Sequence, residues 1–209
     1  GVFELAFSPN GQTFVAQGDF GVFFLVDTAT GAVLQTYDDV NIGGTNIAFN
    51  SQGDLALFGI GNSLIAWNLT TGTVTHLETD SSFPFGTVVA LSVDGHVALS
   101  VADRQLTQWD ITRGEALRTI DFDRDLSVVA LSPDGTTAVL GASDGTLMLW
   151  DVGTGQTIRE FTGAVPYLRS IVFSADGQTV LTTGFASTIL WDVATGQPRL
   201  ILPQLTTGT

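Results

Sequence analysis

The sequence lacks cysteine and lysine, and these two absences already narrow what the protein can do. Without cysteine there are no structural disulfides and no cysteine-based zinc sites. The seven basic residues are all arginines, and 21 acidic residues give a formal net charge of −14. Nucleic acids and anionic membranes are bound through clustered cations. We therefore expect no nucleic-acid binding and no direct membrane insertion. The sequence also has no Gly-rich phosphate loop, so we expect no cofactor.

Long apolar runs are also missing. No run approaches the roughly 18 residues that a membrane-spanning helix needs, and no basic start followed by an apolar core marks a secretory signal. We expect a soluble chain, and its composition is compatible with either a cytoplasmic or an extracellular location. The sequence begins at Gly1 inside the apolar run "VFELAF", so we expect it to be a piece of a longer chain. We also expect it to form part of a larger bacterial-type polypeptide or assembly.

What the sequence does contain is an internal repeat. One phrase, typified by "LWDVGTG", occurs at 25–31, 66–72, 108–114, 149–155 and 190–196. A second, typified by "LSPDG", keeps step with it at 7–11, 49–53, 91–95, 131–135 and 173–177. The tryptophan position of the first phrase recurs after 41, 42, 41 and 41 residues. A period in the range of about 20–50 residues indicates a solenoid, a propeller or another repeat array.

The content of one period favours the propeller. It holds four short runs rich in β-branched and apolar residues, such as those at 126–132, 137–143, 146–152 and 156–162, and none has helical spacing. The "SPDG" and "DVGTG" phrases suit the tight turns of hairpins. In "TLMLWDV" the residues pointing to both sides are apolar, so the sheets should be covered on both faces.

These observations predict an all-β fold, a beta-propeller of five four-stranded antiparallel blades, either complete in itself or part of a larger ring. We expect a single propeller domain over 1–209. Its blades should span approximately 1–40, 41–84, 85–125, 126–166 and 167–209.

The phrases "LSPDG" and "GASDGTLMLWDVGTG", with their counterparts in all five copies, resemble the WD-repeat β-propeller family. The resemblance implies a usual count of seven blades and the docking of partner peptides on one end of the disc. Family members also carry a Gly-His pair that joins an aspartate, a hydroxyl and the tryptophan in a buried network. Here the only histidines, His76 and His96, are not so placed, so we expect the network to be incomplete in every blade.

The inner strands offer little chemistry. Glu4 is their only acid, and one carboxylate cannot supply the acid and base pair of a glycoside hydrolase. Asp121, Asp123 and Asp125 have the spacing that opens a calcium loop, but Leu126 stands where that loop needs glycine. We therefore expect neither an enzyme nor a metal site.

What remains is the surface of one end, where arginine and tyrosine are the residue types that interfaces favour. We expect a non-catalytic scaffold for protein–protein interaction. The alternatives are a structural subunit that assembles with further copies of itself through open terminal blades, and a propeller hydrolase or glycan binder. The candidate partner-binding residues are Asp19, Asp38, Asp39, Asp80, Asp103, Arg104, Asp123, Arg124, Asp144, Tyr167 and Arg169.

Overall fold

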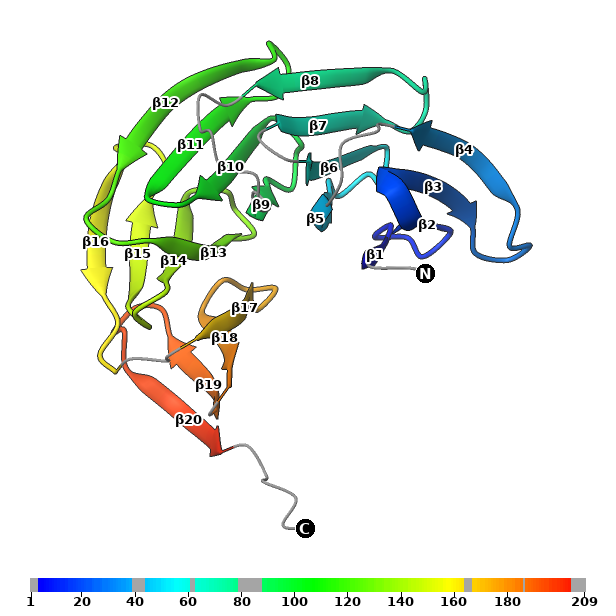
Figure 1. Cartoon of the computed structure of the whole chain (residues 1–209). Helices are drawn as coiled ribbons and strands as arrows, with labels where there is room; N and C mark the ends of the chain where they lie inside the picture. Colours follow the sequence, from blue (N-terminus) through cyan, green and yellow to red (C-terminus); the bar gives the residue numbers. More distant parts are fainter. Residues whose placement is uncertain are drawn as a thin grey trace. The chain divides into compact units, whose positions relative to one another are not determined.

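The structure, a computed structural model, describes residues 4–38, 44–60, 63–78, 88–163, 167–185 and 187–203. Within these ranges the chain forms twenty strands and one short 3₁₀ helix, η1 (Asp19–Gly21). The strands make five four-stranded sheets, and in each sheet they lie in sequence order as an antiparallel meander (Figure 1). The predicted all-β fold of five four-stranded blades is confirmed. No helix in the described ranges is long and apolar enough to cross a membrane.

The five sheets are numbered here in chain order. Sheet 1 contains β1 (Glu4–Phe7), β2 (Thr13–Gln17), β3 (Val22–Asp27) and β4 (Val33–Asp38). Sheet 2 contains β5 (Gly44–Phe49), β6 (Leu55–Ile60), β7 (Ser63–Asn68) and β8 (Val74–Glu78). Sheet 3 contains β9 (Val88–Leu91), β10 (Val97–Ala102), β11 (Gln105–Asp110) and β12 (Glu115–Asp121). Sheet 4 contains β13 (Leu126–Leu131), β14 (Thr137–Ala142), β15 (Leu147–Asp151) and β16 (Gln156–Glu160). Sheet 5 contains β17 (Leu168–Phe173), β18 (Thr179–Gly184), β19 (Ser187–Asp192) and β20 (Pro198–Pro203).

Contacts group the chain into two compact units. Unit 1 comprises Gly1–Ala102 with Thr107–Thr119, and unit 2 comprises Asp103–Leu106 with Ile120–Thr209. The expectation of one domain over 1–209, with its blade limits, stays a prediction. In each sheet we call one end the turn end, where the first and second strands and the third and fourth strands are joined. The opposite end is the loop end, with the connection from the second to the third strand and the connection to the next sheet.

A serine closes the first hairpin at the turn end. In sheet 4, Ser132 Oγ accepts a hydrogen bond from the N–H of Thr137 at 3.0 Å and donates to Asp134 Oδ1 at 2.6 Å. The same carboxylate accepts the N–H of Thr136 at 3.0 Å. The equivalent serines of sheets 1, 3 and 5 accept the same backbone bond. The repeated "SPDG" phrase is therefore a hydrogen-bonded turn that fixes the pairing of the first two strands.

In sheet 2 an asparagine, not a serine, closes the first hairpin. Asn50 stands at the serine position, and its Oδ1 accepts the N–H groups of Gly53 and Leu55, both at 3.1 Å. Its Nδ2 donates to Asp54 Oδ1 at 2.7 Å. The amide thus supplies both the acceptor and the donor that the hydroxyl supplies elsewhere.

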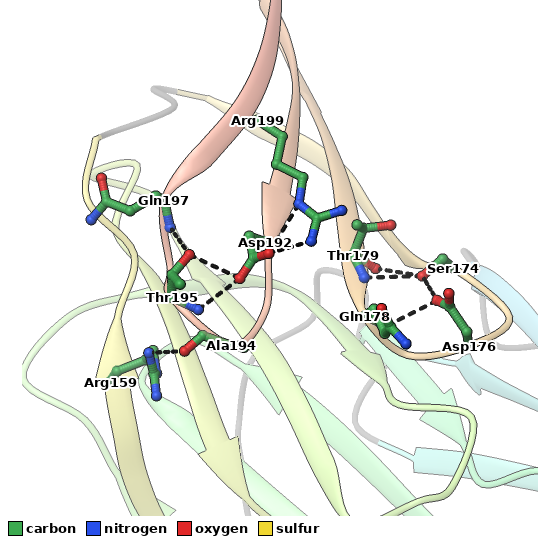
Figure 2. A network of polar contacts seen from close by, with 10 residues as sticks. All are labelled: Arg159, Ser174, Asp176, Gln178, Thr179, Asp192, Ala194, Thr195, Gln197 and Arg199. Atoms are coloured by element: carbon green, nitrogen blue, oxygen red, sulfur yellow. Dashed lines mark hydrogen bonds and ion pairs between the residues drawn. The ribbon is translucent and has the colours of Figure 1, made fainter.

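An aspartate begins the second turn of each repeat except in sheet 2, which has Asn68. Asp151 Oδ1 accepts the N–H of Thr154 at 2.6 Å and the hydroxyl of the same residue at 2.8 Å. Gly155 then adopts a φ of 74°, which glycine reaches without steric strain. Figure 2 shows both kinds of turn in sheet 5, where Arg199 also donates to Asp192.

Apolar clusters between sheets bury the repeated aromatic positions. In unit 1, Phe23 of sheet 1 stacks on Phe58 of sheet 2 with ring centroids 3.9 Å apart. In unit 2, Phe161 meets Trp191 edge to face at 5.7 Å within the cluster that joins sheets 4 and 5. The four tryptophans are each at most 2% exposed, so their rings are packed in the interior and are not presented for stacking on a sugar.

Part of the buried network that the resemblance implies is present in two sheets. Trp109 Nε1 donates to Ser100 Oγ at 2.9 Å in sheet 3, and Trp191 Nε1 donates to Thr182 Oγ1 at 2.8 Å in sheet 5. In sheets 2 and 4 the residues nine positions before the tryptophan are Phe58 and Gly141, which carry no hydroxyl. The hydrogen bond from the tryptophan therefore forms where this position of the second strand is a serine or threonine.

The turn serine predicts a measurable stability loss. Ser132→Ala should lower the free energy of unfolding by about 1–2 kcal/mol, because Ser132 is 5% exposed and the N–H of Thr137 loses its side-chain acceptor. Urea unfolding followed by tryptophan fluorescence measures the change. Ser51→Ala is the control, since Ser51 is exposed and its hydroxyl accepts a long hydrogen bond of 3.4 Å from the side chain of Gln52. Equal stability of the two variants would contradict the role of the hydroxyl.

The turn carboxylates predict acid lability. Hydrogen bonds from serine hydroxyls lower the pKa of Asp94, Asp134 and Asp176, and Arg199 with Thr195 lowers the pKa of Asp192 from 3.8 to about 2. Because these pKa values are lower in the folded chain, their stabilisation is complete above about pH 5 and is lost progressively as the pH falls toward about 2. The urea midpoint should follow this course, with a shallower acid slope for Asp192→Asn. A midpoint that stays constant down to the lowest pH would contradict it.

Candidate functional site

The predicted partner-binding residues that the structure describes fall at the loop ends of their sheets. In unit 1, Asp19 begins η1 and Asp38 ends β4, where it pairs with Val22. The predicted residues Asp39 and Asp80 lie outside the described residues. The remaining candidates belong to unit 2: Asp103, Arg104, Asp123, Arg124, Asp144, Tyr167 and Arg169.

Arg124 is the centre of one group in unit 2. Its Nε lies 2.9 Å from Asp123 Oδ1, and its Nη1 donates to Thr146 Oγ1 at 2.9 Å. The same Nη1 lies 3.8 Å from both Asp144 Oδ2 and Glu160 Oε1. The side chain is only 27% exposed, so this arginine is held in place by three carboxylates and a hydroxyl. Arg124 thus ties the connection before β13 to the connection between β14 and β15.

These contacts fix the ionisation of the group. The hydrogen bond with Asp123 raises the pKa of Arg124 and lowers the pKa of that carboxyl. Hydrogen bonds from the backbone and the hydroxyl of Thr146 lower the pKa of Asp144. A general acid at neutral pH needs a raised carboxyl pKa, so Asp123 and Asp144 are suited to holding charge and not to delivering a proton.

Backbone hydrogen bonds join the turn at Asp103 and Arg104 to the same region. The N–H of Phe122 donates to the carbonyl of Arg104 at 2.8 Å, and that of Leu126 donates to the carbonyl of Asp103 at 2.6 Å. Arg104 Nε also lies 3.0 Å from Asp125 Oδ1. Asp103 adopts a φ of 54°, a left-handed conformation that aspartate tolerates better than most residues. The turn is therefore fixed by its neighbours.

A third connection completes what we call the loop network, residues 103–104, 122–125 and 143–146. The N–H of Ser143 donates to the carbonyl of Asp125 at 2.8 Å, beside the contact between Arg124 and Thr146. The carboxylates of the loop network outnumber its two guanidinium groups, as it contains Asp103, Asp123, Asp125 and Asp144. The loop network is an ordered surface of negative charge. Because it is already ordered, it would lose little conformational entropy on binding a partner.

Tyr167 and Arg169 belong to a second group, which we call the aromatic cluster, with Phe185 as its third member. Tyr167 is 68% exposed and Phe185 is 56% exposed, and their rings meet edge to face at 5.7 Å. The guanidinium carbon of Arg169 lies 3.9 Å from the centroid of the Phe185 ring. Two exposed aromatic rings and an arginine form the kind of surface that dominates binding energy at protein interfaces.

A glycine behind the aromatic cluster positions it. Leu168, between Tyr167 and Arg169, is 7% exposed and packs in the cluster of apolar residues that joins sheets 4 and 5. A Cβ atom at Gly141 would lie 2.7 Å from Leu168 Cδ1 and 2.6 Å from Val128 Cγ2, closer than real Cβ contacts. Because Gly141 has no side chain, Leu168 can pack against it in the core. Tyr167 and Arg169, on either side of Leu168 in the chain, are then at the surface.

The sequence analysis missed Phe185, Asp125 and Glu160 as members of these groups. Phe185 carried a usable signal, because the equivalent position of the fourth repeat is Ser143 and a phenylalanine in a loop is a departure from the repeat. Asp125 had been considered only as part of the calcium-like spacing. In the described ranges, no group of three or more histidine, aspartate or glutamate side chains is placed to hold a metal ion.

Two shallow hollows lie at turn ends of the sheets, one in each unit. One, of about 280 Å³ in unit 1, is lined by polar residues that include Asn68, Asp94, His96 and Thr112. The other, of about 350 Å³ in unit 2, is lined by the turns at 132–134 and 175–177. Their aspartates Asp94, Asp134 and Asp176 are already engaged by the turn serines, so the hollows are by-products of the turns.

Comparisons with known proteins agree with the repeat. The WD domain, G-beta repeat family matches residues 115–151. Autophagy-related protein 16 of Arabidopsis thaliana is 32% identical over 124 residues, which cover 59% of this chain and 24% of that protein. The WD repeat domain-containing protein 83 homolog of Dictyostelium discoideum is 29% identical over 113 residues, covering 53% of this chain and 34% of that protein.

A guanine nucleotide-binding protein subunit beta of Oryza sativa subsp. indica is 28% identical over 139 residues, covering 59% of this chain and 36% of the relative. The matched region thus spans well under two thirds of the length of each of these curated relatives.

Two expectations from the sequence find no support in these comparisons. The named relatives are eukaryotic, so the expectation of a bacterial-type polypeptide is not supported. None of the relatives points to a self-assembling structural subunit, so that alternative is also not supported. The in-register repeats, the five four-stranded sheets and the family match over residues 115–151 together support the resemblance of the chain to WD-repeat β-propeller proteins.

Proposed function

We propose that the chain is a non-catalytic WD-repeat scaffold that binds other proteins or peptides through the loop ends of its sheets. The observation that carries the proposal is the ordering of exposed loop side chains in unit 2. Backbone bonds and ion pairs hold the loop network in place while its carboxylates stay at the surface. An ordered surface of this kind binds a partner without first having to fold.

One relative supports a role in a complex of several proteins. The guanine nucleotide-binding protein subunit beta is, by its name, one subunit of a larger complex. Repetition suits such a role, because a constant core of turns and buried aromatics allows the loops of each repeat to differ. We extend this role to the present chain together with the loop-end residues named above.

A catalytic function is less well supported. The two carboxyl groups of the loop network nearest to Arg124 have lowered pKa values, whereas acid catalysis at neutral pH requires the opposite shift. The tryptophans that a glycan binder would present are buried. The net charge of −14 also makes nucleic acid a poor partner.

The proposal predicts that charge changes at the two ends of the sheets have unequal effects. Peptides are selected from a random library displayed on phage, using the whole 209-residue chain as the target. The double variant Arg104→Gln with Arg124→Gln should weaken the binding of the selected peptides by about tenfold or more, because both arginines order the loop network. Fluorescence polarisation with synthetic peptides gives the dissociation constants.

The matched control removes the same charge from the turn ends. Arg113→Gln with Arg199→Gln also deletes two arginines that pair with aspartates, Asp110 and Asp192. This control should bind the peptides like the unmodified chain. The proposal fails if both double variants weaken binding equally while retaining the unmodified melting temperature, or if no peptide is selected.

A further inference from the structure

We infer that Tyr167, Arg169 and Phe185 form the binding site for a peptide segment in which an aspartate or glutamate adjoins an apolar side chain. This inference rests on the proposed function and names the partner chemistry of that surface. The guanidinium of Arg169 would hold the carboxylate, and the two exposed rings would hold the apolar side chain. Three features of the aromatic cluster carry the argument.

The first is that no carboxylate among the residues described by the structure pairs with Arg169, although the chain is rich in acidic residues. Arg104, Arg113, Arg124 and Arg199 each pair with an aspartate. Within the ranges that the structure describes, no hydrogen bond or ion pair engages the guanidinium of Arg169, whose recorded contact is the ring of Phe185. Its hydrogen-bonding capacity is therefore available to a ligand.

The second feature is the backbone that aims this arginine. Leu168 pairs with Gly184 and Ser170 pairs with Thr183, so Arg169 is the extra residue of a β-bulge in β17. A bulge turns its extra side chain away from the regular alternation of the strand.

Sheet 4 has a bulge at the same repeat position, and there the extra residue is Ser127. The Ser127 hydroxyl donates to the carbonyl of Gly141 at 3.2 Å and so serves its own sheet. Sheet 5 places a long, exposed cation where sheet 4 has a short, internally bonded hydroxyl. The bulge is the same in both sheets, but in sheet 5 its extra residue is exposed to solvent.

The third feature is how the cation is held. A guanidinium lying on an aromatic face keeps its N–H groups at its edge, where they match the two oxygens of a carboxylate. The Phe185 ring at 3.9 Å also restricts the arginine before any ligand arrives. Pre-orientation of this kind raises affinity because less side-chain freedom is lost on binding.

The rings define the second half of the ligand. Tyr167 and Phe185 are both more than half exposed, and their edge-to-face contact at 5.7 Å holds them together. Exposed aromatic rings beside an arginine favour an apolar side chain next to the carboxylate. A phosphate group carries more negative charge than a carboxylate, and the field of a protein with a net charge of −14 repels it more strongly. We therefore assign the site to an acidic side chain of a protein partner.

The test uses the selected phage peptides and the whole chain. Acidic residues next to apolar ones should be enriched among them, and one such synthetic peptide is then titrated by fluorescence polarisation. Arg169→Gln should weaken its binding by about tenfold to a hundredfold, the range for a charged hydrogen bond. Changing the peptide's acid to its amide should weaken binding similarly, and combining both changes should add little.

Further variants separate the parts of the site. Arg169→Lys keeps the charge but not the paired N–H edge, so it should restore only part of the affinity. Phe185→Leu should weaken binding through loss of the ring, whereas Arg113→Gln, another exposed arginine, should have no effect. Melting temperatures of all variants are compared, and an unchanged value shows that the effect comes from binding.

The outcomes distinguish this inference from the proposed function. One outcome is that the Arg104 and Arg124 double variant weakens peptide binding whereas Arg169→Gln does not. In that case the inferred partner chemistry is wrong and the scaffold role stands. Additive effects of the peptide and Arg169 changes would likewise overturn the pairing of Arg169 with the acid. If no acidic peptide is enriched, this inference is wrong. If every loop-end variant binds the peptides as tightly as the unmodified chain does, both proposals fail.

Discussion

The strand register set by the turn side chain at the start of each repeat is the constraint on which the other features depend. A slip of one residue between two strands would exchange the faces of the sheet. Strands such as β15, LMLWD, are buried on both faces, and Leu149 and Trp150 must face different neighbours. The hydroxyl of Ser132 and the amide of Asn50 hold the register of the first two strands of their sheets, and the carboxylate of Asp151 holds the turn that follows β15.

The acidity of the chain has a structural component that composition alone does not reveal. Asp134 and Asp176 accept hydrogen bonds from turn serines and backbone N–H groups. Asp151 and Asp192 accept them from threonines at the second turn. These carboxylates are built into hairpins, so much of the negative charge is a consequence of how the repeat makes its turns. At the loop ends, by contrast, Asp123 and Asp125 pair with arginines, on the surface that we propose for partner contact.

The sequence was sufficient for the features that repeat. The recurrence of "SPDG" and "WDV" phrases predicted the five sheets, their strand order and the burial of Trp67, Trp109, Trp150 and Trp191, since one local solution serves every copy. It was insufficient for the features that do not repeat. Neither the left-handed turn at Asp103 nor the contact between Phe185 and Arg169 has a period, and both depend on which loops become neighbours. Loop-end charges could be named from the sequence, but their pairing could not.

Gly141 gives the aromatic cluster an unusual dependence on the interior of unit 2. Its lack of a side chain leaves room for Leu168, and Leu168 stands directly between Tyr167 and Arg169 in the chain. A change of one methyl group at this buried position would be transmitted through Leu168 to both exposed side chains. During evolution, the recognition properties of such a surface could therefore drift through substitutions in the core, while every residue that touches the partner keeps its identity.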